Sequence, residues 1–450
     1  MKKSLLFLLL IASFTEISAQ WTSQFSGFTT PSRGISQIKI VDANTVWALA
    51  FDNANTTNTI QEFTRTTNGG TTWTAGTIEM GNPDLKIINI CPVSATTAWV
   101  AAIVPSQGRG VLYKTTNGGV SWVQQLTNGF QAPASFLNGV HFFNENTGVA
   151  YGNPISGNRF EIYRTTDGGT TWAALPSTSS AAILNSNELG YNGEPIVAGG
   201  SLWFTTSKGR LYRSTDMGAT FTAHQALTAD FGGGDTVGTT AQALFSDASN
   251  GYLLKTVRSG TAPNYTYART YAITTNGGQT WTPNTPISFS GTRYHLTYVP
   301  GTTRIIATSA DPLNQGTSVS IDNGSSWTTV ESSAPRGVAA FLNLTTGWCG
   351  GVNGVSADGI YKLTGPLGTS DFKATPFKVY PNPASSTVTI SATDIEDYKL
   401  SVSDITGKII MTKSLNGIEN NLDVAALSKG IYFFELTSGQ SREVVKILKN

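Results

Sequence analysis

An eight-residue segment recurs along the chain at nearly constant spacing, and it limits the possible folds more than any other feature. Each copy begins with Ser or Thr, has Asn or Asp third and Gly fifth, and ends with an aromatic residue. The aromatic residues lie 49, 50, 49, 60 and 46 residues apart. Such a period is typical of repeat proteins, whose units bury their apolar faces against their neighbours. The copies are Thr66–Trp73, Thr115–Trp122, Thr165–Trp172, Ser214–Phe221, Thr274–Trp281 and Ser320–Trp327.

Apolar and polar residues alternate ahead of several copies, as in Ile38–Leu49, Val140–Tyr151 and Ala243–Leu254. Each of these segments predicts a strand, a turn and a second strand. The chain has 47 glycines and only 13% charged residues, a composition that favours turn-rich β structure. A unit of about fifty residues with these strands predicts a four-stranded sheet. The array therefore predicts an all-β fold, a β-propeller.

The repeat count predicts seven blades that are closed by the N-terminal strand. Val338–Trp348 and Gly359–Leu363 repeat the first three strands of a unit, but no eight-residue segment follows them. Gln20–Phe25 resembles the stretches that follow the other aromatic ends. We expect it to supply the missing fourth strand and to remove an exposed sheet edge. Residues 20–366 would then form the propeller, with about 50 residues in each blade.

The two ends of the chain differ from the repeat. Residues 1–19 contain two lysines, a short apolar run and a terminal Ala-type cleavage site, which predicts a signal peptide. The apolar run is shorter than the roughly 20 residues of a spanning helix, so we expect no membrane span. Residues 367–376 have the composition of a linker. Residues 377–450 hold short alternating strands that predict a small β-sandwich.

The eight-residue segment resembles the Asp-box, or BNR, repeat of sialidase-like, sortilin-type and photosystem II assembly-factor-like propellers. The resemblance covers most of residues 20–366 and implies that these hairpins lie away from the ligand-binding face. An Asx oxygen accepts backbone N–H bonds in its own turn, which predicts a structural role. The alternative is a row of calcium sites, which Asn in place of Asp would weaken. We expect no metal and no cofactor; the structural residues are Asn68, Asn117, Asp167, Asp216, Asn276 and Asp322.

Residues 377–450 resemble the type A C-terminal sorting domain of the type IX secretion system of Bacteroidetes. The matching segments are Tyr380–Pro383, Asp404–Lys408, Leu427–Tyr432 and Lys446–Lys449. The resemblance implies engagement of the type IX secretion machinery. It also implies a secreted or outer-membrane surface location after transit through the periplasm. The alternative is an ordinary carbohydrate-binding or Ig-like module, because β-sandwiches share this pattern across functions.

The connections from the outer strand of one blade to the inner strand of the next predict the ligand-binding face, around the central channel. Arg33, Arg293 and Arg336 each precede an inner strand, in blades one, six and seven. Three guanidinium groups there could bind a carboxylate or a sulfate; the alternative is three solvated arginines. The other candidates are Asp230 and Asp235, in the long segment 224–241, and Arg258, in the insertion 255–268. The alternative for both segments is that they are longer surface loops with no binding role, because loops tolerate insertions.

These features favour a non-catalytic binding or interaction protein whose ligand is a glycan, a peptide or a protein. The alternative is a glycoside hydrolase, sialidase-like or endoglucanase-like, that uses the same face. Hydrolysis needs two facing carboxyl groups, and no spacing pairs the acidic residues; the Arg-Ile-Pro segment of sialidases is also absent. The formal net charge of +1 argues against nucleic acid as a partner.

Overall fold

The structure is a computed structural model, and it describes residues 21–155, 159–184, 187–226, 230–232, 239–261, 264–287, 295–312, 314–354, 358–365, 377–392, 397–438 and 441–450. The chain divides into two compact units, Met1–Gly368 and Thr369–Asn450. The predicted signal peptide and linker lie outside the described residues. Within the described ranges, no helix has the length and apolar character needed to cross a membrane.

The first unit consists of four-stranded antiparallel sheets, seven of them in the part of the chain that is described, which confirms the all-β prediction. In hydrogen-bonding order, the first sheet is β2 (Arg33–Ile40), β3 (Val46–Asp52), β4 (Glu62–Thr66) and β5 (Thr74–Thr77). The second is β6 (Lys86–Pro92), β7 (Ala98–Ile103), β8 (Gly110–Thr115) and β9 (Val123–Gln125). The third is β10 (Leu137–Phe142), β11 (Gly148–Gly152), β12 (Glu161–Thr165) and β13 (Ala173–Ala174).

The remaining sheets of this unit continue the same order, after one short 3₁₀ turn at Ser177–Ser179. The fourth is β14 (Ile196–Ala198), β15 (Ser201–Thr205), β16 (Arg210–Ser214) and β17 (Thr222–Gln225). The fifth is β18 (Thr239–Phe245), β19 (Gly251–Thr261), β20 (Asn264–Thr274) and β21 (Thr285–Pro286). The sixth is β22 (His295–Tyr298), β23 (Ile305–Ser309), β24 (Gly316–Ser320) and β25 (Thr328–Glu331). The seventh is β26 (Ala339–Asn343), β27 (Thr346–Gly350), β28 (Gly359–Leu363) and β1 (Trp21–Phe25).

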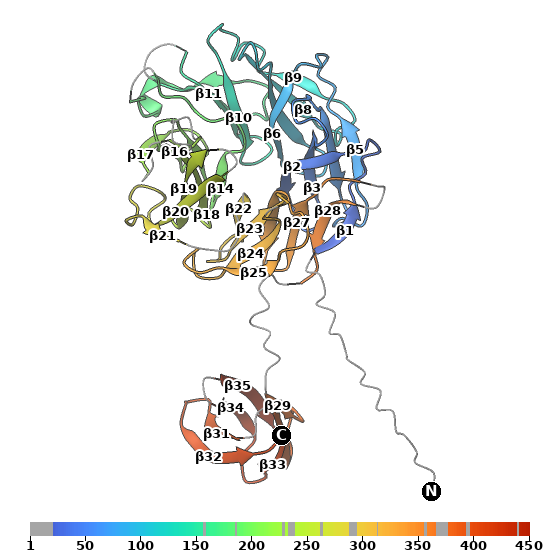
Figure 1. The fold of residues 1–450 in the computed structure, drawn as a ribbon, viewed down its shortest axis with the longest axis vertical. Helices are drawn as coiled ribbons and strands as arrows, with labels where there is room; N and C mark the ends of the chain where they lie inside the picture. The colour runs from blue at the N-terminus through green and yellow to red at the C-terminus, as the bar shows by residue number, and fades with distance from the viewer. Residues whose placement is uncertain are drawn as a thin grey trace. The chain divides into compact units, whose positions relative to one another are not determined.

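The sheets follow one another around the first unit, from the blue β2–β5 to the orange β22–β25 (Figure 1). The first strand of each sheet is its inner strand, and inner strands of neighbouring sheets contact one another at β2–β6, β6–β10, β14–β18, β18–β22, β22–β26 and β26–β2. We expected residues 255–268 to be an inserted loop. Instead, residues 255–261 and 264–268 extend the hairpin of β19 and β20, whose ladder runs from Gly251↔Thr274 to Thr261↔Asn264.

The N-terminal strand belongs to the seventh sheet. β1 pairs antiparallel with β28, with Trp21 opposite Leu363 and Phe25 opposite Gly359. The Trp21 indole N–H also donates to Thr317 Oγ1 in the sixth sheet at 3.2 Å. The buried Asn353 fastens the next stretch, because its amide donates to the carbonyls of Phe28 and Thr30, each at 3.1 Å. Residues more than three hundred positions apart are thereby joined around the start of β2.

A cation on the third strand links most sheets to the next one. In four sheets it stacks on a buried tryptophan of the second strand, as Lys362 does on Trp348 with Nζ 5.6 Å from the ring centroid. Lys362 Nζ then donates to the carbonyl of Gly69, in the eight-residue turn of the first sheet, at 2.7 Å. The other stacked pairs are Arg65 on Trp47, Lys114 on Trp99 and Arg213 on Trp203.

These cations reach the following sheet in the same way. Arg65 donates to Ala95 O, Lys114 to Gly168 O and Arg213 to Ala248 O. In the third sheet Arg164 makes the equivalent bond to Met217 O at 2.9 Å, although its cross-strand partner is Val149. The equivalent positions of the fifth and sixth sheets, set by the ladder register, are Ile273 and Val319. We call the five cations the latch residues.

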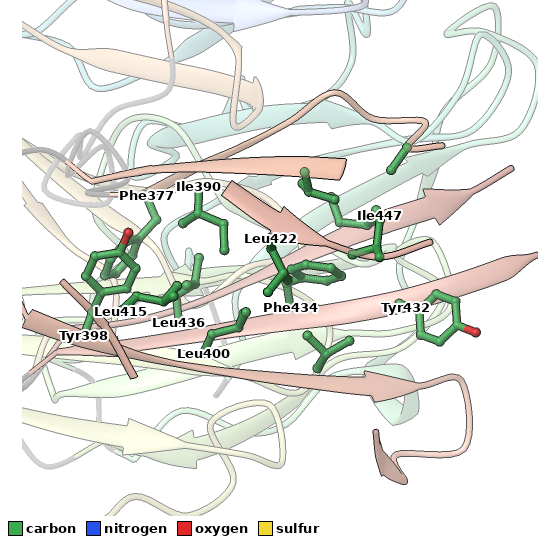
Figure 2. Packing of buried hydrophobic residues seen from close by; sticks show 14 of the residues in the cluster. Phe377, Ile390, Tyr398, Leu400, Leu415, Leu422, Tyr432, Phe434, Leu436 and Ile447 are labelled. Atoms are coloured by element: carbon green, nitrogen blue, oxygen red, sulfur yellow. The ribbon is translucent and has the colours of Figure 1, made fainter. Parts of the chain in front are cut away.

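The second unit is a β-sandwich of two sheets. One has the order β29 (Phe377–Tyr380), β30 (Thr387–Ala392) and β33 (Glu419–Asp423). The other has the order β32 (Ile409–Asn416), β31 (Asp397–Asp404), β34 (Gly430–Ser438) and β35 (Ser441–Lys449). Figure 2 shows the side chains of both sheets meeting between them, with Phe377 and Ile390 from one sheet near Leu400, Phe434 and Leu436 from the other.

The Tyr380–Pro383 segment has a physical role in this sandwich. The Asn382 amide donates to Lys446 O at 2.8 Å and accepts from Leu448 N at 2.9 Å, so it pairs with β35 as a peptide group would. Ala384 continues this pairing by donating its N–H to Leu448 O at 2.8 Å. One edge of the four-stranded sheet is thereby covered, which protects it from pairing with another chain.

We predict that Lys362→Met destabilises the first unit. The variant loses a charged donor to a backbone carbonyl and a cation–π contact, which together are worth about 1–3 kcal/mol. Urea unfolding followed by tryptophan fluorescence measures the change. Lys86→Met, at an exposed position of β6, is the matched control, and we expect it to be nearly neutral. If the two substitutions lowered the free energy of unfolding equally, Lys362 would not link the two sheets as proposed.

Candidate functional site

A large cavity lies between the inner strands and has a volume of about 940 Å³. Its walls come from β2, β14, β18, β22 and β26, each of which is the terminal strand of its sheet. Strand edges present backbone N–H and C=O groups, so this wall offers main-chain donors and acceptors. Its polar side chains include Gln37, Lys39, Asn192, Glu194, Gln242 and His295. We call this space the channel cavity.

The inner strands of the second and third sheets, β6 and β10, are not among the described lining of the channel cavity. Residues 190–195, which we call the strap, lie against β10 instead. Gly193 N donates to Asn138 O at 3.0 Å, and a Cβ atom on Gly139 would lie 2.9 Å from Gly193 O. Glu194 forms an ion pair with Lys39 of β2. The strap therefore separates two sheets from the cavity that the other five share.

Three ionisable groups lie on the second and third sheets near the strap: Cys91, His141 and Tyr151. Burial, helped by the charge of Lys39, lowers the pKa of His141 to about 3. Burial also raises the pKa of Cys91 and of Tyr151. The Cys91 thiol lies 3.6 Å from His141 Nδ1, but at neutral pH both groups are uncharged. The pair lacks the thiolate that a cysteine nucleophile needs.

Two of the three arginines predicted to bind an anion are already paired with carboxylates. Arg33 donates from Nε and Nη2 to the two carboxylate oxygens of Glu62, each at 2.9 Å. Arg336 binds Glu331 in the same bidentate way, at 2.8 and 2.7 Å, and its guanidinium group lies over the Tyr361 ring. Both side chains are largely buried. The fork needed to bind a ligand carboxylate is thus occupied, and neither arginine is the open anion site that we expected.

Arg293 lies outside the described residues, as does Asp235. Asp230 accepts hydrogen bonds from Tyr191 Oη of the strap and, at 2.8 Å, from Gly232 N, so it holds the strap rather than facing the cavity as an isolated acid. Arg258 is exposed on β19, directly opposite Tyr267 of β20. Neither residue lines the channel cavity within its described walls.

Sequence reasoning missed Lys39 and Glu194. Lys39 is the one charged residue in the segment Ile35–Ile40, whose apolar residues are isoleucines, and this is a signal that could have singled it out. The sequence around Glu194 carries no such signal. Glu194 lies in the segment that connects β13 to β14, and only the folded structure brings it close to Lys39. Glu194 is also the one carboxylate among the described residues that line the channel cavity. Glycoside hydrolysis ordinarily uses two.

In each of the six eight-residue turns, the third-position Asn or Asp side chain bonds within its own turn. In the first, Asn68 Oδ1 accepts from Thr72 N at 2.9 Å, and the Asn68 amide donates to Thr72 Oγ1 at 2.9 Å. In the third, Asp167 Oδ1 accepts from Thr171 N at 2.9 Å, and the hydroxyl donates to Asp167 Oδ2 at 2.6 Å. Asn and Asp thus form the same turn, but the hydrogen bond to the hydroxyl runs in opposite directions. The Asn amide donates it, whereas the Asp carboxylate accepts it. Among the described residues, no group of three or more His, Cys, Asp or Glu side chains is placed to hold a metal ion.

The family of secretion system C-terminal sorting domains matches residues 378–450, which confirms the predicted sorting domain. No curated protein matches the chain in sequence. The structure of YCF48 from Cyanidioschyzon merolae is similar to the chain, with a TM-score of 0.52 and 17% identity over 77% of this chain and 99% of that one. A structure of YCF48 bound to D1 peptide has a TM-score of 0.51 and 16% identity over 77% and 97%.

The NanB sialidase of Streptococcus pneumoniae is a more distant match, with a TM-score of 0.39 and 12% identity over 77% of this chain and 71% of that one. Together with the repeated four-stranded sheets, the YCF48 similarities support a β-propeller fold for the first unit. At these identities they bear on the fold alone.

We predict that replacing Asp167, Asp216 and Asp322 together by Asn leaves stability at neutral pH nearly unchanged, whereas replacement by Ala lowers it. The hydrogen bond from Thr171 is the main cause that lowers the pKa of Asp167 to about 2. A lowered folded-state pKa adds stability above the unfolded pKa, and this stability is lost as pH falls from about 4 towards 2. The Asn variant should lose less stability over that interval.

Urea unfolding of the three proteins at neutral and acidic pH measures these differences. Calcium and EDTA should leave every midpoint unchanged. A calcium-dependent midpoint that the Asn variant lacks would show that the turns bind metal.

Proposed function

We propose that the protein is exported by the type IX secretion machinery and binds an extended peptide segment of a partner protein in the channel cavity of a closed, seven-bladed propeller. The sorting domain at residues 378–450 supports export and a location at the cell surface or outside the cell. The contacts of β2 with both β6 and β26, and the place of β1 in the seventh sheet, support a closed ring of seven blades.

The observation that carries the binding proposal is the channel cavity. Its volume of about 940 Å³ lies within the usual range of ligand sites, and its walls are strand edges. Strand edges recognise extended peptides through main-chain hydrogen bonds. The neighbour with bound D1 peptide is consistent with a peptide ligand on this fold. A glycan remains a possible outcome of the test, whereas hydrolysis has a single described carboxylate to support it.

We predict that residues 377–450 are sufficient for export. Fused to a periplasmic reporter in a host with a type IX system, they should carry the reporter across the outer membrane. Removal of these residues from the full chain should leave the rest in the periplasm. A fused reporter that stays in the periplasm would contradict this role, and a host without the system is the control.

We predict that Gln242→Trp weakens ligand binding at least tenfold. Gln242 lies on β18 and lines the cavity, so the larger side chain takes up ligand space. The mature chain and its variants would be compared on peptide and glycan arrays, with released sugars measured in parallel. Gln124→Trp, on the outer strand β9, is the matched control. Sugar release that Gln242→Trp abolishes would establish the hydrolase instead.

A further inference from the structure

A smaller side cavity of about 260 Å³ opens beside the channel cavity. The two cavities share seven lining residues, which come from the strap, β14, β18 and β22: Asn192, Glu194, Ile196, Gln242, Ala243, Leu244 and Leu296. The side cavity therefore has its mouth in the channel wall, between the fourth and fifth sheets. Its volume suits one large side chain or one sugar ring rather than a whole ligand.

The inner wall of the side cavity is mainly aromatic and firmly held. It includes Tyr151, Trp203 and Phe204, whose exposed fractions are 1%, 0% and 3%. Phe204 stacks on Tyr151 with ring centroids 4.7 Å apart, and Trp203 stacks on Phe245 at 3.9 Å. The rings therefore expose only edges or small areas to the side cavity, and no broad ring face is free to stack on a ligand. Such a wall favours an apolar side chain over a sugar, whose ring needs an open aromatic face to stack on.

Three polar side chains of the side cavity lie among the residues that it shares with the channel cavity. Asn192 and Glu194 come from the strap, and Gln242 comes from an exposed position of β18. Several bonds fix the strap: Tyr191 N donates to Thr205 O at 3.2 Å, Tyr191 Oη binds Asp230, and Glu194 is paired with Lys39. A mouth held in place before the ligand arrives lowers the ordering cost of binding.

Two strand edges lie on either side of this mouth. β14 and β18 are the inner, terminal strands of the fourth and fifth sheets, and residues of both line the side cavity. A peptide in extended conformation can bond to such an edge through its backbone, while alternate side chains point into the wall. The geometry thus combines a main-chain track with a pocket for one side chain.

We infer that the side cavity selects the ligand by accepting one large apolar side chain of an extended peptide bound in the channel cavity. This inference rests on the proposed peptide-binding function and adds the residue class that the site prefers. The strap residues act as positioning residues, because they set the mouth of the pocket without forming its apolar wall.

The test uses the mature full-length chain and four acetylated, amidated heptapeptides of Ser and Gly with Leu, Phe, Ala or Asp at the centre. Dissociation constants would be measured by NMR titration. We expect the Leu and Phe peptides to bind about ten- to a hundredfold more tightly than the Ala peptide, because burial of a large apolar side chain has that effect. The Asp peptide should bind most weakly.

Two matched variants separate the pocket from the channel. Ala241 lines only the side cavity and Ala339 only the channel cavity. Ala241→Leu should remove the preference for Leu and Phe and leave the weaker affinity of the Ala peptide unchanged. Ala339→Leu should keep the preference. Thermal unfolding of both variants would show that each is folded.

The outcomes distinguish the two proposals. If peptides bind but all central residues are equal, or if Ala241→Leu keeps the preference, the side-chain pocket is wrong and peptide binding stands. If no peptide binds, both proposals fail. Binding of N-acetylglucosamine oligomers that Ala241→Leu abolishes would assign the pocket to a sugar and overturn the inference.

Discussion

The contact between neighbouring sheets is the constraint on which the first unit depends. No described apolar cluster of this unit belongs to one sheet alone; the cluster around Trp47 and Leu49, for example, also contains Ile90 and Val100 of the second sheet. Apolar burial is not directional, so it does not by itself set the rotation from one sheet to the next. The latch residues add direction, because each bonds a carbonyl of the following sheet, and four of the five also stack on a buried tryptophan of their own sheet. A charged donor to a carbonyl is among the stronger hydrogen bonds, which suits this role.

Local patterns predicted most of the architecture. Alternation and turn residues predicted four strands per repeat, and the similarity of Gln20–Phe25 to other fourth strands predicted its partner, with which β1 does pair. The third-position Asn and Asp residues predicted turns that satisfy themselves, and the hydrogen bonds of Asn68 and Asp167 have this form. These features were accessible because each depends on residues close in sequence, or on a unit that repeats. The Lys255–Ala268 segment was misjudged because a long hairpin and an inserted loop have the same alternating, polar composition.

The candidate site was predicted less well, for a physical reason. An arginine ahead of an inner strand is visible in the sequence, but the glutamate that neutralises it is not: Arg33 finds Glu62 across its own sheet, and Arg336 finds Glu331 on the strand before. Lys39 and Glu194 meet across the space between the first and fourth sheets. Such ion pairs depend on the positions of the strands and sheets relative to one another in the folded unit. Spacing in the chain therefore carried no information about which charges remained available to a ligand.

The fifth and sixth sheets have Ile273 and Val319 where the others have a latch residue. The two borders of the sixth sheet thus lack this cation-to-carbonyl link, but the Arg336–Glu331 ion pair and the Trp21–Thr317 hydrogen bond join it to the seventh sheet. Of the two borders, the one with the fifth sheet therefore depends more heavily on apolar contact. Apolar attraction weakens on cooling, whereas a hydrogen bond to a carbonyl does not share that temperature dependence. Cooling would therefore weaken the border between the fifth and sixth sheets first, at a place in the fold that heating alone would not reveal.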